Sequence, residues 1–216
     1  MRYGVLGTGM VGTALAGRLV QLGHQVMMGA RSAGNAKAVA WAEGAGEGAS
    51  QGSFADAASF GEVVINATSG AHSLDALQAA GAGALRGKVL IDVANPIEPD
   101  SGMPPRLTVC NGDSLAEQLQ RALPEARVVK TLNTVNCSVM VNPGGVPGVH
   151  HVYVCGDDVA AKATVRDLLR ELGWADDRVV DTGDLTAARG AEMYLIHWIT
   201  LMRALGTPQF NLGVQR

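Results

Sequence analysis

The chain has 216 residues, of which 47% are hydrophobic and 17% charged, and its formal net charge is −3. The hydrophobic content excludes wholesale disorder, and no lysine- or arginine-rich run suggests nucleic-acid binding. No apolar stretch reaches the length of about 18 residues that a membrane span needs. Three cysteines without a CxxC pair predict free thiols in a reducing compartment rather than a disulfide or zinc site. Met1 and Arg2 lead directly into a strand-like segment, so we expect no signal peptide and a cytoplasmic location.

Strands and helices alternate along the chain, which is typical of a parallel sheet. The expected strands span residues 3–6, 25–28, 62–67, 88–93, 127–132, 152–155 and 178–181, with a further short one near Ser50. The expected helices span residues 10–22, 36–43, 54–59, 72–80, 114–123, 158–172 and 185–205. Four prolines within residues 95–113 predict a long loop there. We therefore predict one α/β domain over residues 1–216, of Rossmann type, with a doubly wound and mostly parallel sheet.

The last predicted helix is apolar around most of its circumference. Seven residues cover most of it: Met193, Ile196, Trp198, Ile199, Leu201, Met202 and Leu205. Such a helix is buried on more than one side, either within its own domain or between subunits. We favour the second alternative and predict that residues 185–216 form a C-terminal helical segment at the interface of a homodimer.

A glycine-rich turn follows the first predicted strand. It reads Gly7-Thr8-Gly9-Met10-Val11-Gly12, which is a G-x-G-x-x-G motif at a strand-to-helix junction. In such a motif the first glycine makes the turn, the second admits a pyrophosphate, and the third lets helix and strand pack closely. The pyrophosphate then lies at the helix N-terminus. We predict that these six residues bind a dinucleotide.

The end of the second strand indicates which dinucleotide binds. NAD-dependent enzymes place an acidic residue there for the ribose 2′-hydroxyl, whereas this chain has Met28-Gly29-Ala30-Arg31-Ser32. Arg31 can pair with a 2′-phosphate through two charge-assisted hydrogen bonds, and Ser32 can add another. Lys37 adds charge or is simply solvated. We therefore predict NADP(H) as the cofactor.

These motifs together resemble a known family. The segments 7–12 and 29–32 are similar to the NADPH-dependent reductases of the deazaflavin coenzyme F420, and to the cytosolic reductase domain of six-transmembrane ferric reductases. The segments 114–120, 126–134, 154–158 and 180–192 extend this resemblance over nearly the whole chain. Two positions differ from the F420 reductases: Ala30 precedes Arg31 where they tend to have serine, and Asn133 stands where they tend to have histidine. Asn133 is closer to the ferric-reductase branch, so the electron acceptor stays open.

Loops at the carboxyl ends of the strands should line the cleft. The candidates for cofactor contact there are Ala67, Thr68, Ser69, Asn95 and Asn133, with Thr68 and Ser69 facing the nicotinamide ribose. Asn95 and Asn133 hold the carboxamide or the acceptor ring, or serve only as turn residues. His72 matches a histidine of the F420 reductases and contacts the acceptor or caps a helix. Cys137 lies near the same pocket, but no neighbouring cation in the sequence lowers its pKa. We identify no certain catalytic residue and no metal site.

Hydride transfer between flat rings needs stacking and water exclusion rather than a general acid. Dehydrogenases of β-hydroxyacids use a lysine from a C-terminal helical domain, and the helix at 185–205 contains none. We therefore predict an NADP-dependent oxidoreductase that transfers a hydride between NADP(H) and a small-molecule ring acceptor, with coenzyme F420 preferred. The alternatives are an NADPH-dependent flavin or ferric-chelate reductase and a non-catalytic NADP(H)-sensing module.

Overall fold

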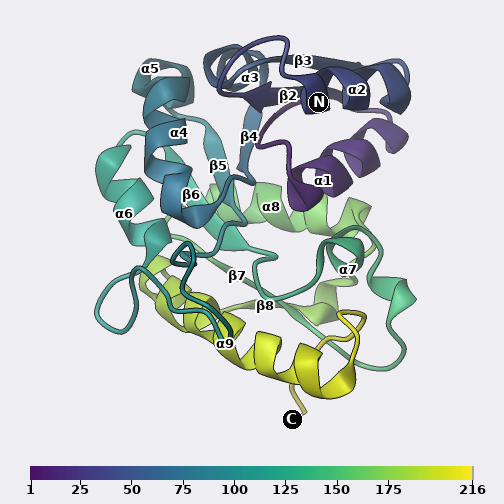
Figure 1. Ribbon diagram of the computed structural model, residues 1–216, viewed down its shortest axis with the longest axis vertical. Helices are drawn as coiled ribbons and strands as arrows, with labels where there is room; N and C mark the ends of the chain where they lie inside the picture. The colour runs from purple at the N-terminus through teal and green to yellow at the C-terminus, as the bar shows by residue number, and fades with distance from the viewer. Residues whose placement is uncertain (216) are drawn as a thin grey trace.

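One sheet organises the computed structural model, which describes residues 1–215. Within these residues the sheet has eight strands in the order β3-β2-β1-β4-β5-β6-β7-β8 (Figure 1). The strands are β1 Arg2–Leu6, β2 Gln25–Ala30, β3 Ala49–Ser53, β4 Val63–Asn66, β5 Val89–Asp92, β6 Arg127–Thr131, β7 Val152–Cys155 and β8 Val179–Asp181. β1 to β6 pair in parallel, and β7 runs antiparallel to β6. The predicted Rossmann-type, mostly parallel sheet is confirmed.

The chain reverses its direction of travel across the sheet between β3 and β4. After β3 at one edge, β4 returns to pair with β1 on the side opposite β2. In open α/β sheets, ligands bind at this switch point, outside the carboxyl ends of the strands. The ends of β1 and β4 therefore mark the expected binding cleft.

Helices cover both faces of the sheet. They are α1 Met10–Gln21, α2 Ala36–Ala45, α3 Phe54–Phe60, α4 Ser73–Ala80, α5 Ala82–Leu85, α6 Leu115–Ala122, α7 Cys137–Val141, α8 Val159–Glu171 and α9 Ala188–Leu205. Successive side chains of a strand point to opposite faces of the sheet. Val5 therefore packs in the core on one face, with α1, α2, α7 and α8, and Leu6 packs in the core on the other face, with α3 to α6. A small third cluster joins α9 to Phe210. α9 lies at the end of the molecule opposite β3 and α2 (Figure 1).

The C-terminal segment differs from the prediction. A 3₁₀ turn at Leu185–Ala187 precedes α9, and the helix ends at Leu205 because Gly206 adopts a left-handed conformation with φ 66°. Residues 207–215 are irregular, and the backbone N–H of His151 donates to the carbonyl of Leu212. The long helix predicted over residues 185–205 is therefore confirmed, whereas residues 207–215 of the predicted helical segment are not helical, and Arg216 lies outside the described residues. No helix in the described part of the chain is both long and apolar enough to cross a membrane.

Candidate functional site

The glycine loop joins β1 to α1 at the switch point. Gly7 has φ 119°, and a Cβ there would lie 2.5 Å from the carbonyl oxygen of Ala67. A Cβ on Gly12 would lie 2.1 Å from the carbonyl oxygen of Gly7. By contrast, nothing in the described chain lies within 4 Å of a Cβ built on Gly9. Packing therefore requires glycine at positions 7 and 12, whereas position 9 opens onto free space.

This free space adjoins the N-terminus of α1. Gly9 is the N-cap and offers no side-chain acceptor to the first-turn N–H groups of the helix. Uncapped N–H groups and the helix dipole both favour an anion. A pyrophosphate fits these features, because a backbone without a Cβ allows its oxygens to approach the N–H groups.

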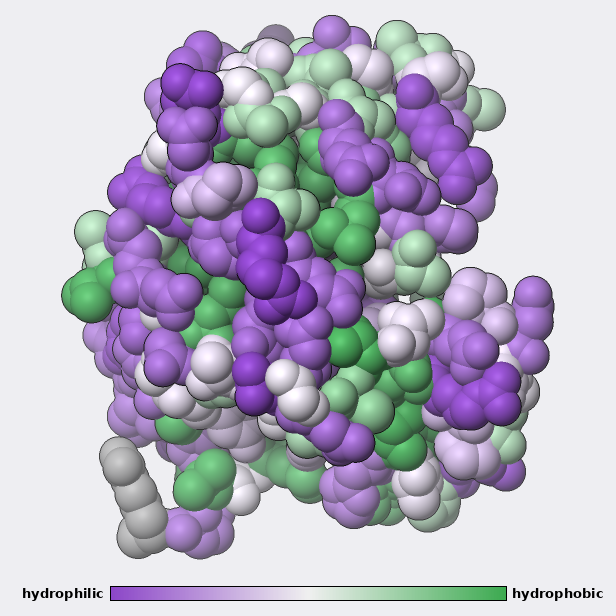
Figure 2. Space-filling view, turned by 90° about the vertical axis from the view of Figure 1, so that its left-hand side faces the viewer, coloured by the Kyte–Doolittle hydropathy of each residue, from purple (hydrophilic) through white to green (hydrophobic). Residues whose placement is uncertain are grey.

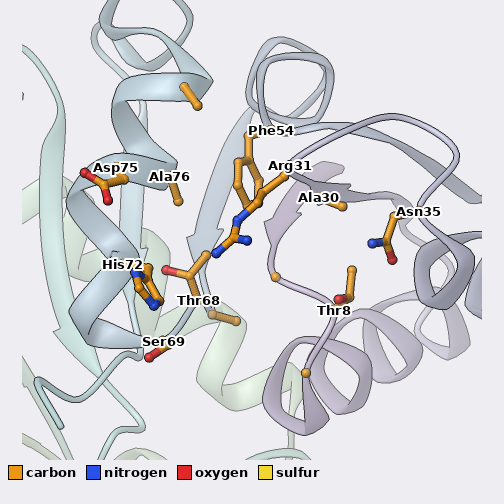
Figure 3. Close-up of a pocket in the computed structure, with 14 residues that line it drawn as sticks. Thr8, Ala30, Arg31, Asn35, Phe54, Thr68, Ser69, His72, Asp75 and Ala76 are labelled. Carbon is orange, nitrogen blue, oxygen red and sulfur yellow. The ribbon is translucent and has the colours of Figure 1, made fainter. Parts of the chain in front are cut away.

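A cavity of about 770 Å³, here called the nucleotide cavity, extends from the glycine loop. Its lining residues are Gly7, Thr8, Gly9, Ala30, Arg31, Asn35, Phe54, Ala67, Thr68, Ser69, His72, Asp75, Ala76 and Ala79. Arg31 follows the last residue of β2 and extends its guanidinium across the cavity toward Thr68 (Figure 3). The predicted residues Ser32 and Lys37 are exposed and do not belong to this lining. Of the three residues predicted to contact a 2′-phosphate, Arg31 is therefore the one that lines the cavity.

A second cavity of about 420 Å³, here called the apolar chamber, shares Ala67, Thr68 and Ser69 with the nucleotide cavity. α1 contributes Met10 and Val11 to its lining. The remaining lining residues are Gly70, Val93, Ala94, Asn95, Ile97, Met103, Asn133, Val135, Asn136, Cys137, Met140, Leu195, Trp198, Ile199 and Met202. Within residues 1–215, no charged side chain lines this chamber. It therefore suits an uncharged, flat group lying next to the end of the nucleotide cavity.

Asn95 and Asn133 both line the apolar chamber, but they mainly bind each other. Asn95 Nδ2 donates to the Asn133 carbonyl oxygen at 2.8 Å, and Asn133 Nδ2 donates to Asn95 Oδ1 at 2.9 Å. Asn133 Nδ2 also donates to the carbonyl oxygen of Ala191 in α9 at 2.9 Å. The pair thus joins the ends of β5 and β6 to α9, and only Asn95 is more than marginally exposed.

His72 and Cys137 lie in different cavities. His72 is exposed on the rim of the nucleotide cavity, beside Asp75 on the same side (Figure 3), and does not line the apolar chamber. His72 therefore lies on the side of the glycine loop and Arg31 rather than in the apolar chamber. Cys137 is half-buried and lines the apolar chamber. Among the described residues, no group of three or more His, Cys, Asp or Glu could hold a metal ion.

The structure also reveals functional residues that the sequence reasoning missed. Asn35 caps α2 by accepting from the N–H groups of Lys37 and Ala38, and it lines the nucleotide cavity. Trp198 in α9 lines the apolar chamber and stacks on Phe210, with ring centroids 5.4 Å apart. The sequence predicts burial of this helix in its own domain or at a dimer interface, but not its contribution to the chamber.

A buried ion cluster lies behind the apolar chamber. Lys130 in β6 contacts Asp92 at 2.7 Å and Glu192 at 2.9 Å, and all three side chains are at most 1% exposed. Burial alone would lower the pKa of Lys130, but the carboxylates of Asp92 and Glu192 raise it. Burial also raises the pKa of Glu192, against the opposing effect of Lys130. A sequence signal existed, because Asp92 and Lys130 are charged residues at the ends of apolar strands.

Comparison with known proteins agrees with this arrangement. A family model described as NADP oxidoreductase, coenzyme F420-dependent, matches residues 2–96. The crystal structure of a proposed F420-dependent NADP reductase from Arthrobacter sp. FB24 is 50% identical to this chain, with a TM-score of 0.93. The similarity covers 100% of this chain and 99% of that chain.

Curated relatives are metalloreductases by name and are much longer than this chain. Metalloreductase STEAP3 of Rattus norvegicus is 34% identical over 194 residues, which are 88% of this chain and 36% of STEAP3. Metalloreductase STEAP2 of Homo sapiens is 29% identical over 119 residues, or 22% of its length. The chain thus spans about a third or less of these relatives. A reductive aminase from Aspergillus terreus, at 20% identity and a TM-score of 0.66, shares the fold.

Proposed function

The chain belongs to the family of coenzyme F420-dependent NADP oxidoreductases and is an NADP-dependent oxidoreductase, and we propose that its hydride acceptor is the deazaflavin coenzyme F420. When bound, the two rings would supply the redox chemistry, with the dihydronicotinamide as hydride donor and the deazaflavin as hydride acceptor. The protein's contribution is to bind, orient and desolvate the two rings.

The observation that carries this proposal is the pair of cavities that share Ala67, Thr68 and Ser69. The nucleotide cavity has the uncapped α1 N-terminus and Arg31 at the positions that a pyrophosphate and a 2′-phosphate require. The nicotinamide end of the same dinucleotide would then reach the wall that the two cavities share. A planar acceptor in the apolar chamber would stack against the nicotinamide ring at this wall.

The lining of the chamber favours a ring over a metal chelate. Val135, Met140 and Ile199 are buried apolar side chains in this lining, and the polar lining groups in the described chain are uncharged. A ferric chelate carries charged ligands, and moving charged groups into an apolar site without a counter-ion is costly. A neutral ring system loses little on the same transfer, and it gains from contact with aromatic and apolar side chains.

The metalloreductase relatives support a second candidate, an NADPH-dependent flavin or ferric-chelate reductase. Asn133, which stands where the F420 reductases tend to have histidine, is the residue that favours it. A ferric chelate could accept electrons only at the chamber mouth, because the interior lacks a charged partner among residues 1–215.

Anaerobic mixing with NADPH and oxidised F420 tests the proposal. We expect the deazaflavin absorbance to bleach at about 1–10³ s⁻¹, with NADH much less effective. Reduction of FMN or ferric citrate without reduction of F420 would establish the second candidate instead. If the protein binds NADPH but reduces none of these acceptors, the remaining interpretation is a non-catalytic NADP(H)-sensing module.

We also propose that the chain forms a homodimer through α9. Met193 and Leu205 are 37% and 57% exposed on this helix. On the side shown in Figure 2, hydrophobic residues reach the surface in separate groups between hydrophilic ones, including at the height of α9. Size-exclusion chromatography with light scattering measures the molar mass and tests this proposal. The mass of a monomer at tens of micromolar protein would refute it.

A further inference from the structure

The charged groups of Asp92, Lys130 and Glu192 are paired with one another inside the protein. Lys130 Nζ donates to Asp92 Oδ2 at 2.7 Å, contacts Glu192 Oε1 at 2.9 Å, and donates to the Ala94 carbonyl oxygen at 2.5 Å. The Lys130 side chain is 0% exposed and lines neither cavity, so its ammonium group faces these three acceptors rather than a substrate. Lys130 is therefore not available as a general acid. Any effect that it has on the reaction must come from positioning the groups that it contacts.

Glu192 connects the cluster to two helices. Its carboxylate accepts from the backbone N–H of Leu115 at 2.8 Å and from that of Ala116 at 3.1 Å, at the start of α6. These N–H groups lie in the first turn of α6, where intrahelical hydrogen bonds leave donors free and the helix dipole favours an anion. Because Glu192 itself lies in α9, one buried carboxylate ties α9 to α6 and, through Lys130, to the ends of β5 and β6.

The face of α9 that carries Glu192 continues into the apolar chamber. Leu195, Ile199 and Met202 follow it by three, seven and ten positions, and all three line the chamber. Residues three and four apart share a helix face. At a rise of about 1.5 Å per residue, Met202 lies about 15 Å along the axis from Glu192, so a small tilt at the anchor moves the far wall.

The other end of the cluster reaches the wall shared by both cavities. Asp92 Oδ1 accepts from Asn66 Nδ2 at 2.8 Å, and Asn66 Oδ1 accepts from Thr68 Oγ1 at 2.7 Å. Thr68 lines both cavities. A continuous chain of buried polar contacts therefore joins the nucleotide-side wall to α9 on the acceptor side.

We propose that Glu192 and Lys130 are positioning residues that hold α9 at a fixed distance from the shared wall and thereby set the width of the apolar chamber. Replacing a buried ion cluster by neutral residues is often tolerated by the fold, so stability alone gives little reason to keep it. The proposal rests on the proposed function only in taking the apolar chamber as the acceptor site.

The first test is Glu192→Gln, with Arg189→Gln as the matched control. Arg189 ties α9 to α6 through Glu117 at 2.6 Å but contacts neither Lys130 nor the chamber. We expect Glu192→Gln to raise the KM for F420 at least about tenfold, to lower kcat less, and to leave the Kd of NADPH within about twofold. Arg189→Gln should leave all three within about twofold. An unchanged KM in a folded Glu192→Gln protein, or equal losses for NADPH and F420, would overturn the proposal.

A second measurement needs no acceptor and so separates this proposal from the proposed function. Hydrogen exchange of amides in residues 192–202 should accelerate in Glu192→Gln but not in Arg189→Gln. If Glu192→Gln does not fold, the triple variant Asp92→Asn, Lys130→Met, Glu192→Gln leaves no unpaired buried charge and takes its place. If the α9 amides of a folded cluster variant exchange at the wild-type rate, the positioning role is refuted. If the wild-type protein fails to reduce F420, only the proposal that F420 is the acceptor is refuted.

Discussion

Replacing Gly9 by alanine should separate cofactor binding from folding. The backbone of Gly9 has φ −81° and ψ −178°, which any L-residue adopts, and nothing in residues 1–215 lies within 4 Å of the added methyl group. The methyl group would instead project into the space over the α1 N-terminus. We therefore expect a folded protein that binds NADPH poorly.

The two effects can be given magnitudes. Gly→Ala stabilises by about 0.4–1 kcal/mol through the unfolded chain, and loss of a glycine N-cap offsets a similar amount, so the free energy of unfolding should change by less than about 1 kcal/mol. A hydrogen bond to a charged group is worth about 1.5–3 kcal/mol. Losing two bonds between pyrophosphate and first-turn N–H groups costs at least about 3 kcal/mol, which raises the Kd of NADPH at least about 100-fold.

Gly12→Ala is the contrasting variant. Its methyl group would lie 2.1 Å from the Gly7 carbonyl oxygen, and this backbone atom cannot move without distorting the turn. Overpacking of this kind costs about 1–3 kcal/mol, or about 2–12 °C in Tm for a chain of this size. Calorimetric titration with NADPH and thermal unfolding of both variants provide the assay. Near-normal NADPH affinity in Gly9→Ala, or a larger loss of Tm in Gly9→Ala than in Gly12→Ala, would refute the reasoning about the loop.

Two further predictions concern charge and thiol reactivity. Arg31→Ala should weaken NADPH binding by about 1.5–3 kcal/mol and leave NADH nearly unchanged, as measured by titration of each nucleotide, and equal losses would argue against a 2′-phosphate contact. Iodoacetamide at pH 8 should alkylate exposed Cys110 but not Cys155, because burial raises the pKa of Cys155 to about 12. Bound F420 should slow the labelling of Cys137, which lines the apolar chamber, and peptide mass spectrometry distinguishes the three sites.

Local features of the site could be predicted from the sequence, because neighbouring residues determine them. The glycine loop, Arg31 after the second strand and Thr68 after the fourth depend only on strand ends and turn chemistry. The long loop after β5 likewise follows from its prolines. The alternating strand and helix pattern was enough to predict the sheet, although the antiparallel orientation of β7 was not predicted.

The ion cluster could not be predicted in this way. Asp92 and Lys130 become direct neighbours only because β5 pairs with β6 in a register that sets these two residues opposite each other. Glu192 joins them from a helix 62 positions further along the chain than Lys130. A charged residue in an apolar strand signals that a partner exists, but only the strand order and the docking of α9 identify that partner.

The cluster and the apolar chamber together explain how charges can lie close to a site that must stay uncharged. Lys130 donates to the carbonyl of Ala94, and Ala94 itself lines the chamber, so one residue of backbone separates the ions from the chamber. The charges are paired with one another and with the α6 N-terminus, and they present no free donor to the chamber. A hydride needs a dry, well-aligned path rather than a proton donor. Ions placed behind the wall can therefore fix the alignment of the chamber without bringing charge or water into it.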